Sequence, residues 1–131
     1  MILLDTQVVA WTVGGPNRLS RSARRAVERE SRRSGLAIAS ATLYELAQLA
    51  ASGAIRIRRT PAEWLGELVR EAGLGIRDIT TDIAVVAAHL PPTFPADPFD
   101  RLITATAIVE RIPLVTSDTR IRESRLAKTI W

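Results

Sequence analysis

Short apolar runs alternate with longer helical segments along this chain, and this alternation constrains the fold more than any other feature. Runs of strand length lie at residues 1–5, "MILLD", residues 36–40, "LAIAS", and residues 112–118, "IPLVTSD". Strands that alternate with helices indicate a parallel sheet covered by helices on both faces. The sequence therefore predicts a single α/β domain over residues 1–131, with three layers and a mostly parallel central sheet.

Start and stop signals mark the helices between these runs. The clearest helix spans residues 60–73, where Thr60 and Glu63 form a capping box. Residues 20–35 are interpreted as an arginine-rich surface helix because their apolar stripe is thin, and Ser40 is expected to cap the following helix. The remaining predicted elements are a strand or connector over 74–80, helices over 81–90 and from 98 onward, a short helix or turn over 119–125, and a short final strand over 127–131.

Composition excludes several protein classes. No run of 18 uncharged apolar residues is present, so no membrane span is expected. The start, "MILLDTQVVAW", has no basic region and carries Asp5, which argues against a signal peptide. Without cysteine the chain has neither a disulfide framework nor a thiolate zinc site. We therefore expect a cytoplasmic protein.

The basic residues are almost all arginine, and the net charge is +4. Arginine suits phosphate and carboxylate partners because its planar fork binds both in a bidentate manner. This excess of arginine indicates a nucleic acid partner or reflects only the composition of the genome.

Acidic residues are predicted to meet at one edge of the sheet. Asp5 and Asp118 each end an apolar strand, and ligands of parallel sheets bind outside the carboxyl ends of the strands. Glu45 lies early in the helix after the second strand, so it is close to the same edge. Asp100 joins them if its helix also begins there. Clustered carboxylates stay ionised when cations compensate them, and Mg²⁺ or Mn²⁺ at such a site can activate water at a phosphodiester.

Each acid also has a purely structural interpretation. Asp97 fits the N-cap of the helix that begins at Pro98, and Asp100 then occupies its third position. Asp5 and Asp118 could cap the helices that follow them. Periodicity places Glu45 opposite the apolar stripe of its helix, which favours a solvated surface glutamate. Residue patterns alone leave both interpretations open.

The segments "MILLDT", "SATLYELAQL", "DPFDRLITATAIVERIPLVTSD" and the terminal "IW" together resemble the PIN-domain ribonucleases, in particular VapC-type toxins of toxin–antitoxin pairs. The resemblance implies a parallel sheet between helices and hydrolysis of RNA to 5′-phosphate and 3′-hydroxyl ends. It also implies that a hydroxyl at Thr116 supports the site and that Asp97 caps its helix or supports a ligand. The residues implied to bind Mg²⁺ or Mn²⁺ and to carry catalysis are Asp5, Glu45, Asp100 and Asp118.

The chain departs from the resemblance at two positions. Many relatives have histidine where this chain has Gln7, and again where it has Pro95. His89, the only histidine, replaces neither. The acidic quartet is intact, so the departures leave open what those histidines would contribute.

The resemblance also implies partners, namely an antitoxin protein and a second copy of the chain. Trp11 and Leu43 would then be contact residues beside the pocket. The arginines of residues 20–34 are interpreted as a solvated surface. Residues 56–59, "RIRR", are expected at the opposite edge of the sheet, because they follow the Glu45 helix, and no role in guiding RNA into the site is assigned to them.

Other functions remain open at this stage. A PIN-like module could bind nucleic acid without turnover, or serve only as an interaction protein. An aspartate followed by threonine at a strand end also suggests a haloacid-dehalogenase-like phosphatase. That chemistry requires an acid two residues after the first, where this chain has Gln7.

Overall fold

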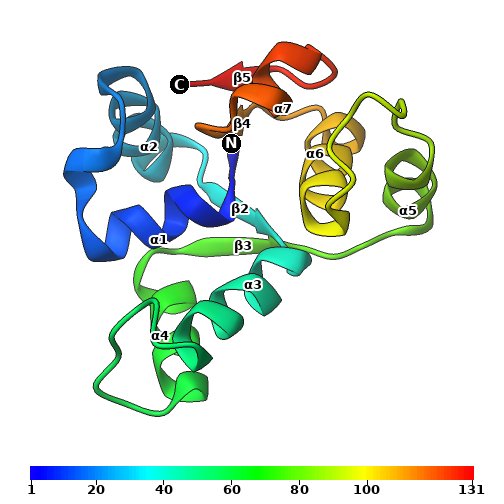
Figure 1. Ribbon diagram of the computed structural model, residues 1–131. Helices are drawn as coiled ribbons and strands as arrows, with labels where there is room; N and C mark the ends of the chain where they lie inside the picture. The colour runs from blue at the N-terminus through cyan, green and yellow to red at the C-terminus, as the bar shows by residue number, and fades with distance from the viewer.

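A parallel five-stranded sheet lies between helices on both faces (Figure 1). The computed structural model describes residues 1–131 apart from the side chain of Pro16. In spatial order the strands are β3 (Leu74–Arg77), β2 (Leu36–Ala39), β1 (Ile2–Leu4), β4 (Leu114–Val115) and β5 (Thr129–Ile130). β1 thus pairs with β2 on one side and β4 on the other. The predicted three-layer α/β architecture is confirmed.

Helices follow most strands directly. They are α1 (Thr6–Gly14), the 3₁₀ turn η1 (Pro16–Arg18), α2 (Arg21–Arg33), α3 (Ser40–Ala51), α4 (Pro61–Glu71), α5 (Thr81–Ala88), α6 (Pro98–Glu110) and α7 (Thr119–Ser124). In Figure 1, α1 to α4 lie to one side of the sheet, and α5 and α6 lie to the other. Among the described residues, none of these helices has the length and apolarity needed to cross a membrane.

The core has one part on each face of the sheet, because successive strand residues point to opposite faces. Ile2 and Leu4 pack with Val8 of α1, Leu46 of α3 and neighbouring apolar residues. Leu3 lies between them in sequence and packs on the other face with residues of α6, including Ile103 and Ala107. Both faces of β1 are therefore dry, as expected for a central parallel strand.

Local signals were mostly confirmed, with one correction. The capping box is present: the backbone N–H of Glu63 donates to the Thr60 hydroxyl, and the Thr60 N–H donates to the Glu63 carboxylate, both at 3.3 Å. The undecided segment at 74–80 forms strand β3. The prediction that Ser40 caps α3 is wrong, because Ala39 occupies the cap position and Ser40 is already helical. β2 therefore continues into α3 without a side-chain cap.

The arginine-rich helix α2 lies on the surface as predicted and buries its small stripe residues Ala23 and Ala26. The stripe continues at Glu30, which sequence periodicity did not identify as buried. Arg29 forms an ion pair with the Glu30 carboxylate, and the Ser34 hydroxyl donates to it. These partners satisfy a charge that would otherwise be costly to bury.

Candidate active site

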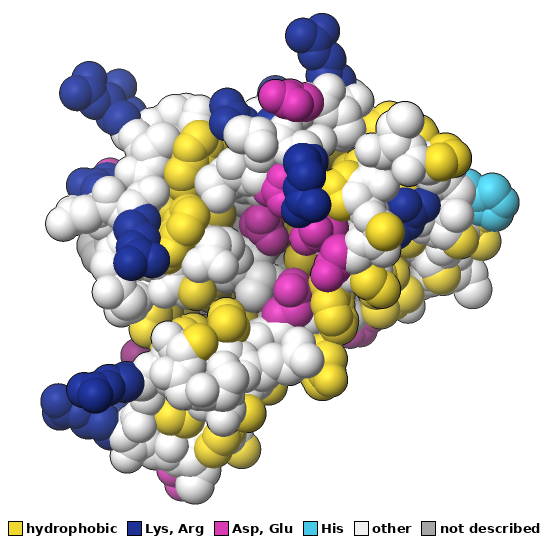
Figure 2. Space-filling model, in the orientation of Figure 1, with side chains coloured by type: hydrophobic (Ala, Val, Ile, Leu, Met, Phe, Trp, Pro, Cys, Tyr) yellow, Lys and Arg dark blue, Asp and Glu magenta, His cyan; other side chains and the backbone are white. Residues whose placement is uncertain are grey.

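An acidic pocket lies at the carboxyl edge of the sheet, where the ends of β1 and β4 meet the starts of three helices. Its volume is about 390 Å³. Figure 2 shows acidic side chains gathered in this hollow of the surface. The residues that line it are Asp5, Thr6, Gln7, Glu45, Gln48, Leu49, Asp100, Ser117, Asp118 and Arg120. The structure therefore brings together all four acids that the sequence proposed as ligands.

Asp5 is the most buried of these acids, with only 8% of its surface exposed. One carboxylate oxygen caps α1 by accepting the Thr6 N–H at 2.7 Å, and the other accepts the Thr116 hydroxyl at 2.7 Å. Burial raises the pKa of the Asp5 carboxyl above its usual value, although both hydrogen bonds act in the opposite direction. Asp5 thus has a fixed orientation and an environment that disfavours its negative charge.

Thr116 connects the two central strand ends. Its side chain is fully buried, and its oxygen also accepts the backbone N–H of Asp118 at 3.1 Å. One hydroxyl therefore holds Asp5 at the end of β1 and the turn that carries Asp118 after β4. This supports the implied role of Thr116.

Asp118 caps α7 by accepting the backbone N–H groups of Arg120 at 2.8 Å and Ile121 at 3.4 Å. The Arg120 guanidinium also donates to this carboxylate, at 2.9 Å to its second oxygen. These hydrogen bonds, with the Arg120 side chain contributing most, lower the pKa of Asp118. Asp118 therefore caps α7 and also lines the pocket.

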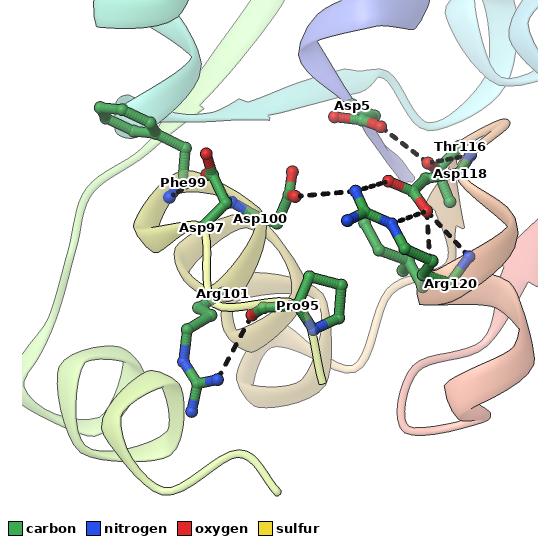
Figure 3. Close-up of polar contacts among 10 residues, drawn as sticks. Asp5, Pro95, Asp97, Phe99, Asp100, Arg101, Thr116, Asp118 and Arg120 are labelled. Carbon is green, nitrogen blue, oxygen red and sulfur yellow. Dashed lines mark hydrogen bonds and ion pairs between the residues drawn. The ribbon is translucent and has the colours of Figure 1, made fainter. Parts of the chain in front are cut away.

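Asp97 and Asp100 divide their roles at the start of α6 (Figure 3). The exposed Asp97 caps the helix, accepting the N–H groups of Phe99 at 2.8 Å and Asp100 at 3.1 Å. Asp100 is half-buried and lines the pocket. Burial raises the pKa of Asp100 to about 7, and the surrounding carboxylates, with Asp97 first among them, add to this shift.

Glu45 corrects the expectation from helical periodicity. The residue is half-buried rather than solvated, and its carboxylate accepts the Thr6 hydroxyl at 2.6 Å. The Thr6 oxygen is also hydrogen-bonded to the fully buried hydroxyl of Thr42, 3.1 Å away. Burial raises the pKa of Glu45, and the negative charges of Asp5 and Asp97 raise it further. Leu46 packs into the core, while Glu45 faces the pocket instead of open water.

Among the pocket residues that sequence reasoning did not single out, Thr6 and Arg120 contact the acids. Thr6 links Glu45 to α1, and the only sequence signal for it is its place directly after Asp5. Arg120 extends from α7 and lies between Asp118 and Asp100, with its Nη2 atom 2.9 Å and 3.8 Å from their oxygens (Figure 3). Its only sequence signal is a cation two positions after Asp118.

Gln7 and Pro95, the two positions at which the chain departs from the family resemblance, have different surroundings. Gln7 is exposed and lines the pocket. The Pro95 carbonyl accepts a hydrogen bond from the Arg101 guanidinium at 3.4 Å. Pro95 lies in the loop that leads into α6. His89 is exposed at the end of α5, where its Nδ1 lies 2.8 Å from the Val85 carbonyl oxygen. It does not line the acidic pocket.

The donor chemistry of the pocket fits a hard divalent cation, because four carboxylates supply oxygen ligands and no sulfur. Burial raises the pKa values of Asp5, Glu45 and Asp100, and neighbouring carboxylates raise them further. Among the described residues, no group of three or more acidic or histidine side chains is positioned to hold a metal ion in this arrangement. Arg120 is the cation that contacts the acids.

Comparisons with known proteins find relatives of this chain by sequence and by fold. The chain is 40% identical to ribonuclease VapC22 of Mycobacterium tuberculosis, over 99% of this chain and 98% of that protein. Its fold is similar to VapBC-1 of nontypeable Haemophilus influenzae, with a TM-score of 0.74 and 14% identity over 98% of this chain and 96% of that one.

A second solved structure, VapBC2 of Rickettsia felis bound to a promoter DNA fragment, has a TM-score of 0.73. Identity there is 19%, over 98% of this chain and 97% of that one, so the likeness concerns the fold. The model of the PIN domain family matches residues 2–125. With this match and the near full-length relative, the chain belongs to the PIN domain family.

Proposed function

We propose that this protein is an endoribonuclease that uses Mg²⁺ or Mn²⁺ to hydrolyse RNA phosphodiester bonds. The observation that carries the proposal is the convergence of four carboxylates in one pocket. The relative at 40% identity is a ribonuclease, which supports RNA as the substrate. The alternative is a PIN-fold module that binds nucleic acid without turnover, and the tests below distinguish the two.

In this proposal Asp5, Glu45, Asp100 and Asp118 hold the cation. A bound divalent cation would lower the pKa of a water that attacks phosphorus and would stabilise the leaving oxygen, giving 5′-phosphate and 3′-hydroxyl products. The role of the surrounding residues is positioning. The Thr116 hydroxyl and the Thr6 N–H orient Asp5.

Two further side chains fix the remaining acids. The Thr6 hydroxyl orients Glu45, and Asp97 holds the first turn of α6, which carries Asp100. Such supporting groups keep ligands in place and limit the rearrangement needed when the cation binds.

We also propose that the protein acts as the toxin of a toxin–antitoxin pair in the cytoplasm. Supporting this, solved proteins of the same fold include a toxin–antitoxin complex from Klebsiella pneumoniae and several VapBC proteins. The proposed partners are RNA, a cognate antitoxin and a second copy of the chain. The phosphatase alternative is not retained, because the family is the PIN domain and position 7 carries Gln7 in place of an acid.

The metal requirement is tested first. Purified protein incubated with structured RNA is expected to cleave it in Mg²⁺ or Mn²⁺ and to lose cleavage in EDTA, because in the proposed mechanism the cation activates the water and stabilises the leaving oxygen. The ends are identified by their sensitivity to phosphatase and by ligation. Cleavage that persists after chelation contradicts the metal mechanism, and binding without cleavage in either metal favours the silent module.

Paired substitutions test the division of roles in α6. Asp100→Asn is expected to lower the cleavage rate by about 10²-fold or more, as for removal of one charge-stabilising group. Asp97→Asn should lower it by no more than about tenfold, because asparagine caps a helix about as well as aspartate. Equal reductions in the two variants would show that the roles are not divided.

Asp100→Asn should lower the cleavage rate but raise the stability of the fold. In EDTA, Asp100→Asn is expected to raise the free energy of unfolding by roughly 1–3 kcal/mol, because it removes a half-buried charge that its neighbours repel, and one pKa unit corresponds to about 1.4 kcal/mol. Urea titration followed by circular dichroism measures this. Asp5→Asn is a poorer test, since the Asp5 carboxylate accepts two structural hydrogen bonds.

Arg120 is expected to compete with the cation for Asp118 and Asp100. Arg120→Gln should therefore strengthen Mn²⁺ binding about two- to fivefold, since an exposed ion pair contributes about 0.2–1 kcal/mol. Isothermal titration calorimetry measures the affinity, and Arg122→Gln on the same helix is the matched control. Unchanged or weaker Mn²⁺ binding in Arg120→Gln would refute the competition.

The partners are tested by light scattering. We expect the chain alone to measure as a dimer, and we expect a stable complex after co-expression with the reading frame next to its gene. A strictly monomeric chain that co-purifies with nothing would argue against the toxin role and leave the nuclease chemistry standing.

A further inference from the structure

A second groove adjoins the acidic pocket, between α1 and the C-terminal end of α3. Its volume is about 420 Å³. Gln7 and Leu49 line both this groove and the acidic pocket, so the two hollows share a wall and meet there. An extended ligand bound at the acids can therefore continue into the groove without leaving the surface.

Two arginines from distant parts of the chain line this groove. Arg18 ends η1, Arg56 follows α3, and both are exposed. Neither has an ion pair among the described residues, whereas Arg59 pairs with Glu67 and Arg120 with Asp118. The described lining of the groove contains no acidic residue. The groove therefore carries positive charge that no side chain of the protein neutralises.

Arg56 lines this groove although residues 56–59 follow the C-terminal end of α3. After α3 the chain turns back at Gly53, whose φ of 77° is readily adopted by glycine. The backbone N–H of Ile55 then donates to the Leu49 carbonyl at 3.2 Å. This turn returns the chain along the end of α3 and places Arg56 in the groove beside α1.

Apart from Gln7 and a glycine, the other residues that line the groove are apolar, and they include Trp11 and Ile55. The buried Nε1 of Trp11 has no hydrogen-bond acceptor among the described residues. Single-stranded nucleic acids bind surfaces that combine arginines for the phosphates with aromatic and apolar surface for the bases. Guanidinium groups bind phosphate in a bidentate manner, and this favours a nucleic acid strand over an uncharged peptide.

We propose that this groove binds the RNA strand on one side of the bond that is cut, with Arg18 and Arg56 each contacting a backbone phosphate. The proposal rests on the ribonuclease function proposed above. It gives the enzyme affinity for RNA at a place where the acids do not repel the strand. It also predicts that substrate binding extends beyond the nucleotides at the acidic pocket.

The test measures binding separately from cleavage. Arg18→Gln/Arg56→Gln is made in an Asp100→Asn chain, and anisotropy of a fluorescein-labelled 12-nucleotide single-stranded RNA is followed over a range of salt concentrations. The control, Arg32→Gln/Arg70→Gln in the same background, removes two exposed arginines that lie outside the groove. The net charge of the two variants is therefore equal.

We expect the groove variant to bind the RNA about tenfold more weakly than the control in 0.1 M salt. For the groove variant, the slope of log affinity against log salt concentration should be less steep than for the control. The difference should be about 0.7 for each phosphate contact that is lost. In a cleavage assay with Asp100 restored, the groove variant should show a raised KM and an unchanged kcat, because the groove lies away from the reacting atoms.

Equal affinities and salt slopes in the two variants would overturn the proposal. So would a groove variant that binds RNA normally but no longer forms a complex with a co-expressed antitoxin, because the groove would then be a protein interface. A parent chain that cleaves no RNA with Mg²⁺ or Mn²⁺ refutes the proposed function instead. The anisotropy measurement does not depend on cleavage, so the two failures are distinguishable.

Discussion

Parallel pairing of β1 with β4 is the interaction on which the acidic site depends. Leu3 pairs with Leu114 and Leu4 with Val115, so the two strands end side by side although 110 residues separate them. The first residues beyond this paired register are Asp5 and Thr116, and the hydrogen bond between their side chains closes the end of the strand pair. Because both faces of β1 are buried, a shift in register would move core side chains to the wrong face. The packing of the core thereby also determines where the acids stand.

The aspartates at this edge serve the fold as well as the pocket. Asp5, Asp97 and Asp118 each cap a helix, and the helix N–H groups they accept partly compensate their negative charge. Burial raises the pKa values of Asp100 and Glu45, and also that of Asp5 despite its capping hydrogen bond. The cluster is thus held by folding interactions in an arrangement that its own electrostatics oppose. Arg120 relieves this repulsion at Asp118 and Asp100, where the proposed cation would bind.

The acidic pocket and the adjoining groove have opposite charge, which suits a polyanionic substrate. The four acids of the pocket repel a phosphate backbone unless the proposed cation neutralises them, whereas the positive charges of Arg18 and Arg56 attract it with or without that cation. Gln7 lies where the two regions meet. An uncharged amide there separates the two regions without adding to either charge.

The sequence by itself determined the elements and the candidate ligands. The capping box at Thr60, the cap at Asp97 and the alternation of strands with helices depend on neighbouring residues, so local patterns were sufficient to predict them. The resemblance to PIN-domain ribonucleases singled out Glu45 even though helical periodicity placed it in solvent. Only the tertiary structure decided that Glu45 faces the Thr6 hydroxyl, that Arg120 lies between two acids, and that Arg56 folds back beside α1. Each of these depends on which helix face meets a distant segment. Packing between elements determines that contact, and residue spacing along the chain does not.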